Sequence, residues 1–208
     1  VQGQLSVAPE HASPAALKMM RKPNIEYFDD FMRRFKTSNE KAGKEQYVVP
    51  YFQCAHPGIG PEETIELALY MKKSGLRPRQ VQMFMPTPAT IATAMYVSGE
   101  DPYTKSDVFV ARGDRERSRQ RALLFYWKRE EWPHVREALK SWNRGDLIGK
   151  GPQHLVPPGP AYGAWKFWTR NKNAVRYDTH MGLKVERARK FEEDEQNWEA
   201  VVKTSKRG

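Results

Sequence analysis

Three polar side chains that could act in acid–base chemistry directly follow apolar stretches of this 208-residue sequence. Glu10 and His11 come after residues 4–8, and His56 comes shortly after residues 47–52. A histidine titrates near neutral pH and a carboxylate accepts protons, so either type suits proton transfer. The three together would also offer ligands to a metal ion. Plainer interpretations stay open: Glu10 as a surface carboxylate stabilised by a helix dipole, and both histidines as ordinary turn residues.

The sequence contains a single cysteine, Cys54. One cysteine excludes an internal disulfide framework, and it excludes a metal site built from cysteines of this chain alone. Because Cys54 ends an apolar, β-prone stretch, we expect a small buried hydrophobic side chain rather than a nucleophile.

Helix signals recur through the first hundred residues. Ser13 followed by Pro14 predicts the start of a short helix that reaches Met20. Asn24 is placed to cap a second helix, which Gly43 would close in a left-handed conformation. A third helix is expected over residues 61–75, with acidic residues at its positive end.

Strand patterns precede the first and the third of these helices, and another strand pattern precedes the loop after residue 85. Residues 4–8 alternate polar and apolar side chains, residues 47–52 are almost continuously apolar, and residues 81–85 form a third stretch. The continuous pattern of 47–52 predicts a strand covered on both faces, although Pro50 is unusual there. Three rounds of strand, loop and helix predict an α/β fold with parallel strands and right-handed crossovers. Chemistry in such folds lies at the carboxyl ends of the strands, here residues 9–11, 54–58 and 86–90.

The pattern changes after residue 100. Residues 108–110 predict a short strand. Asp114 is expected to cap a helix that ends near Trp127, and residues 135–142 predict a further helix. Glycine and proline then accumulate over 149–163, and the charged tail looks partly disordered. We expect three parts: βα units over 1–100, a helical extension over 101–149 and a basic, aromatic tail over 150–208. Three methionines, at positions 71, 83 and 85, are expected in the core.

Basic residues are concentrated in the second half. Residues 1–100 hold 12 basic and 10 acidic side chains, whereas residues 101–208 hold 23 and 15. A basic region favours contact with RNA or another polyanion, and the aromatic and cationic residues 165–170 would suit base stacking. The alternatives are a simply solvated basic region and an aromatic tail that packs on the domain. The arginines of 112–121 do not form one stripe and are interleaved with acids, which favours a solvated helix.

Hydrophobic residues make up 39% of the sequence, enough for one core. No apolar run approaches the ~20 residues of a membrane span, and no signal peptide is visible at the start. We therefore expect a cytoplasmic protein with no membrane partner.

An ordered series of motifs resembles one family. The succession "VAPEH", "VPYF…AHPG" and "QVQ-F-PTP-T", followed by "MY-SG-DP", "RSRQRALL" and "REAL", is similar to the YgiQ-type radical S-adenosylmethionine (SAM) family over roughly residues 1–149. The resemblance implies that the three strands are the fourth to sixth of a partial barrel. It also implies that the chain, which opens on Val1, is the C-terminal portion of a longer enzyme of unknown substrate.

The resemblance implies roles for the strand ends. In the intact protein a [4Fe–4S] cluster would give one electron to the sulfonium of SAM, and cleavage of the bond between sulfur and the ribose carbon would leave methionine and a 5′-deoxyadenosyl radical. Glu10 is expected to bind a ribose hydroxyl or amino group of SAM, and the backbone near Cys54, Met83 and Phe84 to face its adenine. His56 would lie at the border with the substrate. Two further residues, His11 and Thr87, are expected on the substrate side.

The sequence departs from this family in one decisive respect. Such clusters are held by thiolates in a C-x3-C-x2-C motif, and this chain has one cysteine. We therefore expect that the chain alone retains neither cluster nor SAM and is inactive, and that its partner is the missing N-terminal half of the barrel. The alternative is a free-standing basic α/β module that binds nucleic acid.

Overall fold

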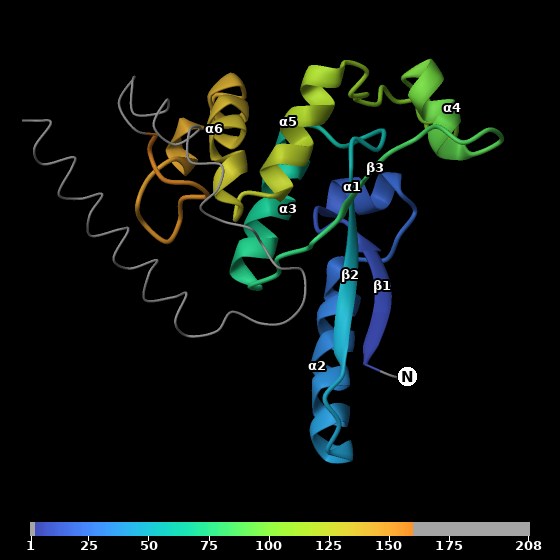
Figure 1. The fold of residues 1–208 in the computed structure, drawn as a ribbon. Coiled ribbons are helices and arrows are strands. Elements are labelled where there is room, and N and C mark those ends of the chain that lie inside the picture. The colour runs from blue at the N-terminus through green and yellow to red at the C-terminus, as the bar shows by residue number, and fades with distance from the viewer. Residues whose placement is uncertain (1–2, 160–208) are drawn as a thin grey trace, which may run out of the picture. The chain divides into compact units, whose positions relative to one another are not determined.

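The computed structural model describes residues 3–159, which belong to one compact unit ending at Gly159 (Figure 1). Three strands and six α-helices follow one another along this part of the chain. In order they are β1 (Gln4–Glu10), α1 (Pro14–Met19), α2 (Ile25–Ala42), β2 (Tyr47–Cys54), α3 (Pro61–Lys73), β3 (Val81–Met83), α4 (Ile91–Ser98), α5 (Asp114–Leu124) and α6 (Trp132–Ser141). Short 3₁₀ turns occupy Arg129–Glu131 and Gly145–Leu147. The stretch at 165–170, with the rest of the tail after 159, lies outside the described residues.

The strands form one parallel sheet in the order β1-β2-β3, which confirms the predicted α/β class. β1 pairs with β2 from Gln4 opposite Tyr47, and β2 pairs with β3 from Phe52 opposite Val81. The register of β1 shifts between Val7 and Glu10. Since all three strands run the same way, their carboxyl ends lie at one edge of the sheet.

Local signals set the helix ends much as predicted. The side chain of Asn24 accepts a hydrogen bond from the backbone of Ile25 at the start of α2, and Gly43 ends that helix in the left-handed conformation. Pro14 and Pro61 stand at the first positions of α1 and α3, where a missing N–H does no harm. Capping chemistry is local, so it is readable from the sequence.

Several expectations from the sequence are wrong after residue 90. Residues 91–98 form α4, which the sequence analysis did not predict, and its cap is the hydroxyl of Thr90. Residues 108–110 form no strand: only Asp107 makes an isolated bridge, to Glu100. α5 has Gly113 at its N-cap, and Asp114 is its first helical residue. Short segments are governed by their surroundings more than by propensity, which explains these errors.

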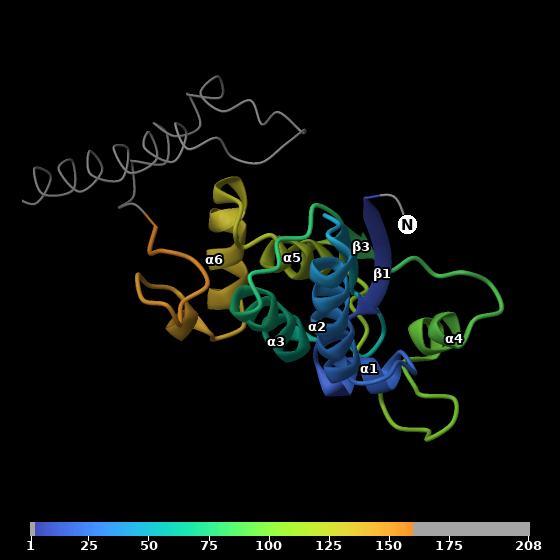
Figure 2. The same ribbon diagram turned by 90° about the horizontal axis from the view of Figure 1, so that it is seen from below.

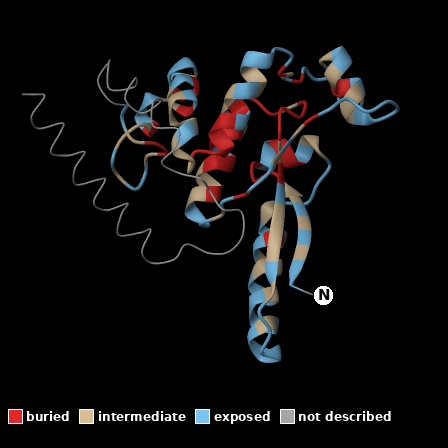
Figure 3. Ribbon diagram, viewed as in Figure 1, coloured by how far each residue is buried: buried red, intermediate tan, exposed pale blue. Residues whose placement is uncertain are grey.

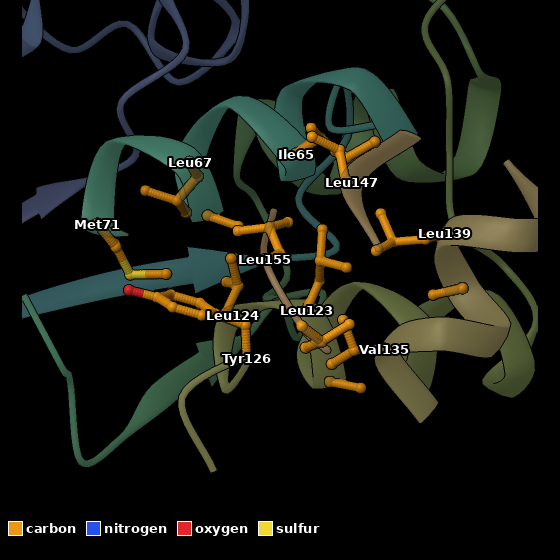
Figure 4. Close-up of a cluster of buried hydrophobic side chains, with 14 of the residues drawn as sticks. Ile65, Leu67, Met71, Leu123, Leu124, Tyr126, Val135, Leu139, Leu147 and Leu155 are labelled. Carbon is orange, nitrogen blue, oxygen red and sulfur yellow. The ribbon is translucent and has the colours of Figure 1, made fainter. Parts of the chain in front are cut away.

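One hydrophobic core joins the βα units to the later helices (Figure 4). Figure 2 shows α5 between α6 and the strands, and α5 contacts α3, α6, β2 and β3. Leucines 155 and 147, which follow the last helix, pack into the same core. The buried hydrophobic side chains of this cluster include Phe52, Cys54, Ile65, Leu67, Met71, Leu123, Leu124, Val135 and Leu139.

Within residues 3–159, only one face of the sheet is covered by helices. Phe52 and Cys54 are the buried residues of β2, and both belong to the core, so Tyr51 and Gln53 point the other way. Gln82 of β3 stands opposite Gln53 and shares its face. We call this side the open face; it is defined by Gln4, Ser6, Ala8, Tyr47, Val49, Tyr51, Gln53 and Gln82. Figure 3 shows exposed and half-buried residues along β1 and β2, in contrast to the buried side of α3 and α5.

Two predictions of burial are therefore wrong. The strand at 47–52 is not covered on both faces, because its alternate residues lie on the open face. Met85, expected in the core, is 76% exposed, because β3 ends at Met83 and the chain leaves the sheet. Met71 is fully buried as predicted, and Met83 is half-buried against the core. No helix in the described part of the chain has the length and apolar character needed to cross a membrane.

The loop after β2 is packed closely against α1 at Gly58. This glycine has a φ of +86°, and a Cβ there would lie 2.5 Å from Cγ of Met19. Its N–H donates to the carbonyl of Phe109. Gly75, after α3, also has a positive φ, +68°, but a Cβ there would meet nothing within 4 Å.

These two glycines make a matched pair for a stability test. We expect Gly75→Ala to lower the free energy of unfolding by about 1 kcal/mol, the cost of a left-handed alanine. Gly58→Ala adds a clash with Met19, so we expect a loss of about 2–4 kcal/mol. Urea denaturation of both variants measures the difference. Equal losses would show that the loop is not packed on α1 as described.

Candidate functional site

The loops after β2 and β3 meet at the carboxyl edge of the sheet. The backbone N–H of Phe84 donates to the carbonyl of Cys54 at 2.9 Å, which continues the pairing one step beyond β3. The ring of His56 meets the ring of Phe84 edge to face, with centroids 5.2 Å apart. The structure therefore brings together Cys54, His56 and Phe84, three of the predicted site residues.

The chain turns sharply where β1 and β2 end. Glu10 has a φ of +67° and Ala55 a φ of +60°, and neither is a glycine. Such conformations are uncommon for residues with a Cβ, and they concentrate at functional sites. The two equivalent turns support the location of the candidate site at this edge.

Glu10 keeps a partly accessible carboxylate, with 21% of its side chain exposed. Its Oε1 lies 3.7 Å from Nζ of Lys22, and that ammonium also donates to the carbonyl of Ala8. At 3.7 Å the ion pair is loose, so the carboxylate retains the capacity to accept hydrogen bonds from a ligand.

His11 is completely buried, although its sequence position suggested an accessible loop. Its Nδ1 accepts the backbone N–H of Ser13 at 3.0 Å, so Nε2 carries the proton, and Nε2 has no hydrogen-bond partner among the described residues. Burial, together with the nearby His56, lowers the pKa of His11 to about 3. The ring is therefore neutral at physiological pH.

His56 is also buried, against Phe84 and beside the carbonyl of Pro57. Its Nδ1 lies 2.7 Å from that carbonyl oxygen. Because a carbonyl only accepts, Nδ1 holds the proton, and Nε2 is the free acceptor of the neutral ring. Burial lowers the pKa of His56 from its ordinary value, so this histidine too favours the neutral form.

Cys54 is confirmed as a buried core residue. Its side chain has no exposed surface, and burial raises the pKa of its thiol to about 11. A thiol held in this state is neither a nucleophile nor a metal ligand at neutral pH. Among the described residues, no group of three histidine, cysteine or acidic side chains is arranged to hold a metal ion, so Glu10, His11 and His56 do not form such a group.

Met83 is the last residue of β3, and Thr87 lies in the loop that follows it. Met83 packs against the core, whereas Thr87 is exposed. The carbonyl of Thr87 accepts hydrogen bonds from the hydroxyls of Thr90 and Thr93, at 2.9 and 2.7 Å. This network anchors the start of α4 and fixes the loop that carries Thr87.

Two residues of α5 hold the strand-end loops, and the sequence analysis gave them no such role. The Gln120 side chain accepts the N–H of Ala55 through Oε1 and donates to the carbonyl of Ile59 through Nε2, both at 2.8 Å. Arg117, one turn earlier, donates to the carbonyl of Phe84 at 2.8 Å. One sequence signal could have indicated that Gln120 is buried: this polar residue has helical spacing from apolar side chains of the same helix.

The remaining arginines of α5 only partly match the predicted solvated helix. Arg115 and Arg119 approach Glu137 of α6, at 2.9 and 3.5 Å. Arg119 is largely covered, and it also lies 3.7 Å from Glu116. These side chains join two helices rather than forming a free basic stripe.

We expect substitution by leucine to lower the free energy of unfolding more at Gln120 than at Gln82. Gln120→Leu removes both bonds and leaves the buried N–H of Ala55 and the carbonyl of Ile59 without partners, so we expect a loss of about 2–4 kcal/mol in unfolding free energy. Gln82→Leu on the open face is the matched control, and its free energy of unfolding should change by less than about 0.5 kcal/mol. Chemical denaturation gives both values. Faster hydrogen exchange of the Ala55 amide in Gln120→Leu would locate the effect, and unchanged exchange would contradict it.

The buried His11 predicts a specific pH dependence. The unfolded chain takes up a proton near pH 6.5, but the folded ring does not until about pH 3, so the unfolded state binds more protons as pH falls and stability is lost. His11→Asn keeps an oxygen acceptor for Ser13 and cannot titrate. Between pH 7.5 and 5.0 we expect the free energy of unfolding to fall by about 2 kcal/mol more in the unmodified chain than in this variant. Parallel urea-denaturation curves for the two proteins would contradict the prediction.

Comparisons with known proteins find related sequences over most of the chain. The family model "Domain of unknown function (DUF3362)" matches residues 79–207, from the start of β3 onward. A UPF0313 protein of Methanocella arvoryzae is 46% identical over 158 residues, which cover 76% of this chain and 26% of that protein. UPF0313 proteins of Pseudomonas aeruginosa and Clostridium perfringens are 44% and 40% identical, over 76% and 85% of this chain.

The chain spans only about a quarter of the length of these curated relatives, between 22% and 27%. No solved structure matches it. The DUF3362 match extends over more than half of the chain, and the similarity to each of these relatives covers at least three quarters of it. The chain therefore belongs to the DUF3362-containing UPF0313 family, which is the YgiQ-type radical SAM family that its motifs resemble.

Proposed function

We propose that this chain is the C-terminal portion of a YgiQ-type radical SAM protein and supplies half of the barrel in which SAM is bound. The observation that carries the proposal is the parallel sheet, whose strand ends meet at one edge and whose open face is largely polar. A barrel needs this arrangement, with helices outside and functional side chains at the carboxyl mouth. Family membership supports the same conclusion.

The residues of this chain do not fit an iron–sulfur cluster. A cluster requires several accessible thiolates, and the only thiol is that of Cys54, buried in the core with its pKa raised to about 11. The cluster must therefore be held by another part of the intact protein, and this chain alone is inactive. The reducing conditions that such a cluster needs suit a cytoplasmic location.

The strand ends do fit parts of SAM. The loosely paired carboxylate of Glu10 would accept hydrogen bonds from the ribose hydroxyls or the amino group. His56 and Phe84 form a firm, mostly apolar wall suited to an adenine ring, and the backbone at Cys54 and Met83 lies beside it. When bound with its cluster, SAM would supply a radical that abstracts hydrogen from the substrate. Thr87, which is exposed, is proposed for the substrate side, whereas His11 has no exposed surface with which to reach a substrate.

The partner of this chain is the remaining half of the barrel. β1 pairs with β2 along one edge, and no strand within residues 3–159 pairs with its other edge. Unpaired peptide groups on a parallel strand favour addition of a further strand. The outer side of β3 is different, because α5 contacts it.

The role of Glu10 can be tested in the intact protein, purified with its cluster under anaerobic conditions. Glu10→Gln keeps the shape of the side chain but removes the charge that strengthens hydrogen bonds to the ligand. We expect the Kd for SAM to rise about tenfold or more. Isothermal titration calorimetry under argon measures it.

Two control variants separate the possible causes. Glu26→Gln makes the same change on the exposed side of α2 and should leave the Kd unchanged. Lys22→Gln removes the ion pair with Glu10 and the hydrogen bond to the carbonyl of Ala8 but keeps the carboxylate, so a loss of SAM affinity equal to that of Glu10→Gln would indicate a structural effect. An unchanged Kd in Glu10→Gln would remove Glu10 from the site. Failure of the unmodified intact protein to bind SAM would overturn the proposed function itself.

A further inference from the structure

A hollow of about 360 Å³ opens beside β3, away from the strand ends described above. The side chain of Tyr51 borders it from β2, the segment entering β3 contributes a second side, and the end of α5 with the residues after it contributes a third. Its lining consists of Tyr51, Arg79, Gln80, Val81, Gln82, Arg121, Phe125 and Lys128.

Within residues 3–159, the lining carries three cations and no carboxylate. Arg79 is exposed, and Arg121 has nearly half of its side chain exposed. The carboxylate of Glu131 lies 3.7 Å from Nη1 of Arg121 and is not part of the lining. Three positive charges converging on one hollow create a potential that attracts an anion.

Two of the cations lie over the ring of Phe125. Nζ of Lys128 lies 4.2 Å from the centre of the Phe125 ring, and Cζ of Arg121 lies 5.1 Å from it. The ring itself is buried. Cations held over an aromatic face lose less freedom on binding than solvated lysines and arginines do.

The other side of the hollow is aromatic and rich in amides. Tyr51 is 36% exposed on the open face of the sheet, and its ring is available for stacking. The exposed amides of Gln80 and Gln82 stand on the same border, each with donors and acceptors. An aromatic ring, amides and cations within one small hollow match the three parts of a nucleotide: base face, base edge and phosphate.

We propose that this hollow binds a nucleotide unit, with its phosphate among Arg79, Arg121 and Lys128 and its base stacked on Tyr51. The source of that unit is a free nucleotide or a single-stranded RNA, which share this chemistry. The inference goes beyond the proposed function, since it needs neither SAM nor a cluster. Of the arginine run at 112–121, only Arg121 is among the described residues that line this hollow.

Charge removal tests the phosphate contacts in the 208-residue chain. Fluorescence anisotropy with a labelled single-stranded RNA of ten nucleotides, at several salt concentrations, gives the Kd and its salt dependence. We expect Arg79→Ala with Lys128→Ala to weaken binding about tenfold or more, and to lower the slope of log K against log salt by about 1.4. Lys44→Ala with Lys73→Ala removes the same charge from exposed positions outside the hollow and should change the Kd by less than about twofold.

Loss of the aromatic ring tests stacking. Tyr51→Leu should weaken RNA binding at least about fivefold without changing the salt slope, because no phosphate contact is lost. Tyr27→Leu, at an exposed tyrosine on α2, is the matched control and should bind like the unmodified chain. Thermal unfolding of each variant verifies that it is folded, because all substituted side chains are at least partly exposed.

Competition with AMP identifies the source. Displacement of the RNA by millimolar AMP indicates a free-nucleotide site. Resistance to AMP indicates an RNA strand that places one of its nucleotides in the hollow. Either result supports the proposal only if the Arg79 and Lys128 substitutions weaken binding. Equal losses in the hollow pair and in the Lys44–Lys73 pair would overturn it, because nonspecific charge would then explain binding. Absence of binding by RNA and AMP at low salt would also overturn it. Neither result bears on SAM binding, so this inference and the proposed function fail separately.

Discussion

Gln120 enters the apolar interior with both ends of its side-chain amide hydrogen-bonded, one to Ala55 and the other to Ile59. A buried amide is tolerated only when its donors and acceptors are satisfied, so the loop after β2 and the helix α5 must keep a fixed relation to each other. Arg117 extends the same constraint to the carbonyl of Phe84. Through these two side chains a helix remote in sequence determines where the ends of β2 and β3 lie. The candidate site therefore depends on α5 although α5 supplies none of its predicted ligand contacts.

The sheet divides the molecule into a packed side and an open side. On the packed side, helices cover apolar residues of β2 and bury them in the core that continues to α6. On the open side, glutamines and tyrosines remain accessible, which is unusual for a parallel sheet. A polar, uncovered face is expected of strands that line the interior of a barrel completed elsewhere. The same face borders the cationic hollow, so one feature of the fold serves both proposals.

Much of the fold follows from local patterns. Asn24 and Gly43 bracket α2 because capping depends on neighbouring residues, and three successive strand–helix units predict a parallel sheet because that connection allows little else. The family was recognisable from an ordered series of motifs, and the location of polar loops at the carboxyl edge followed from the topology. Cys54 was expected to be buried from its apolar surroundings, and it is.

The sequence alone determined the three strands, every described α-helix except α4, the parallel topology, the family and the inability of a single cysteine to hold a cluster. Tertiary structure decided which face of β2 is covered, the burial of His11, the exposure of Met85 and the role of Gln120. It also assembled the hollow, whose lining comes from segments that are distant along the chain. The physical reason is the range of the interactions: caps and turns act between neighbouring residues, whereas burial and hydrogen bonding across the core depend on which distant segments the fold brings into contact.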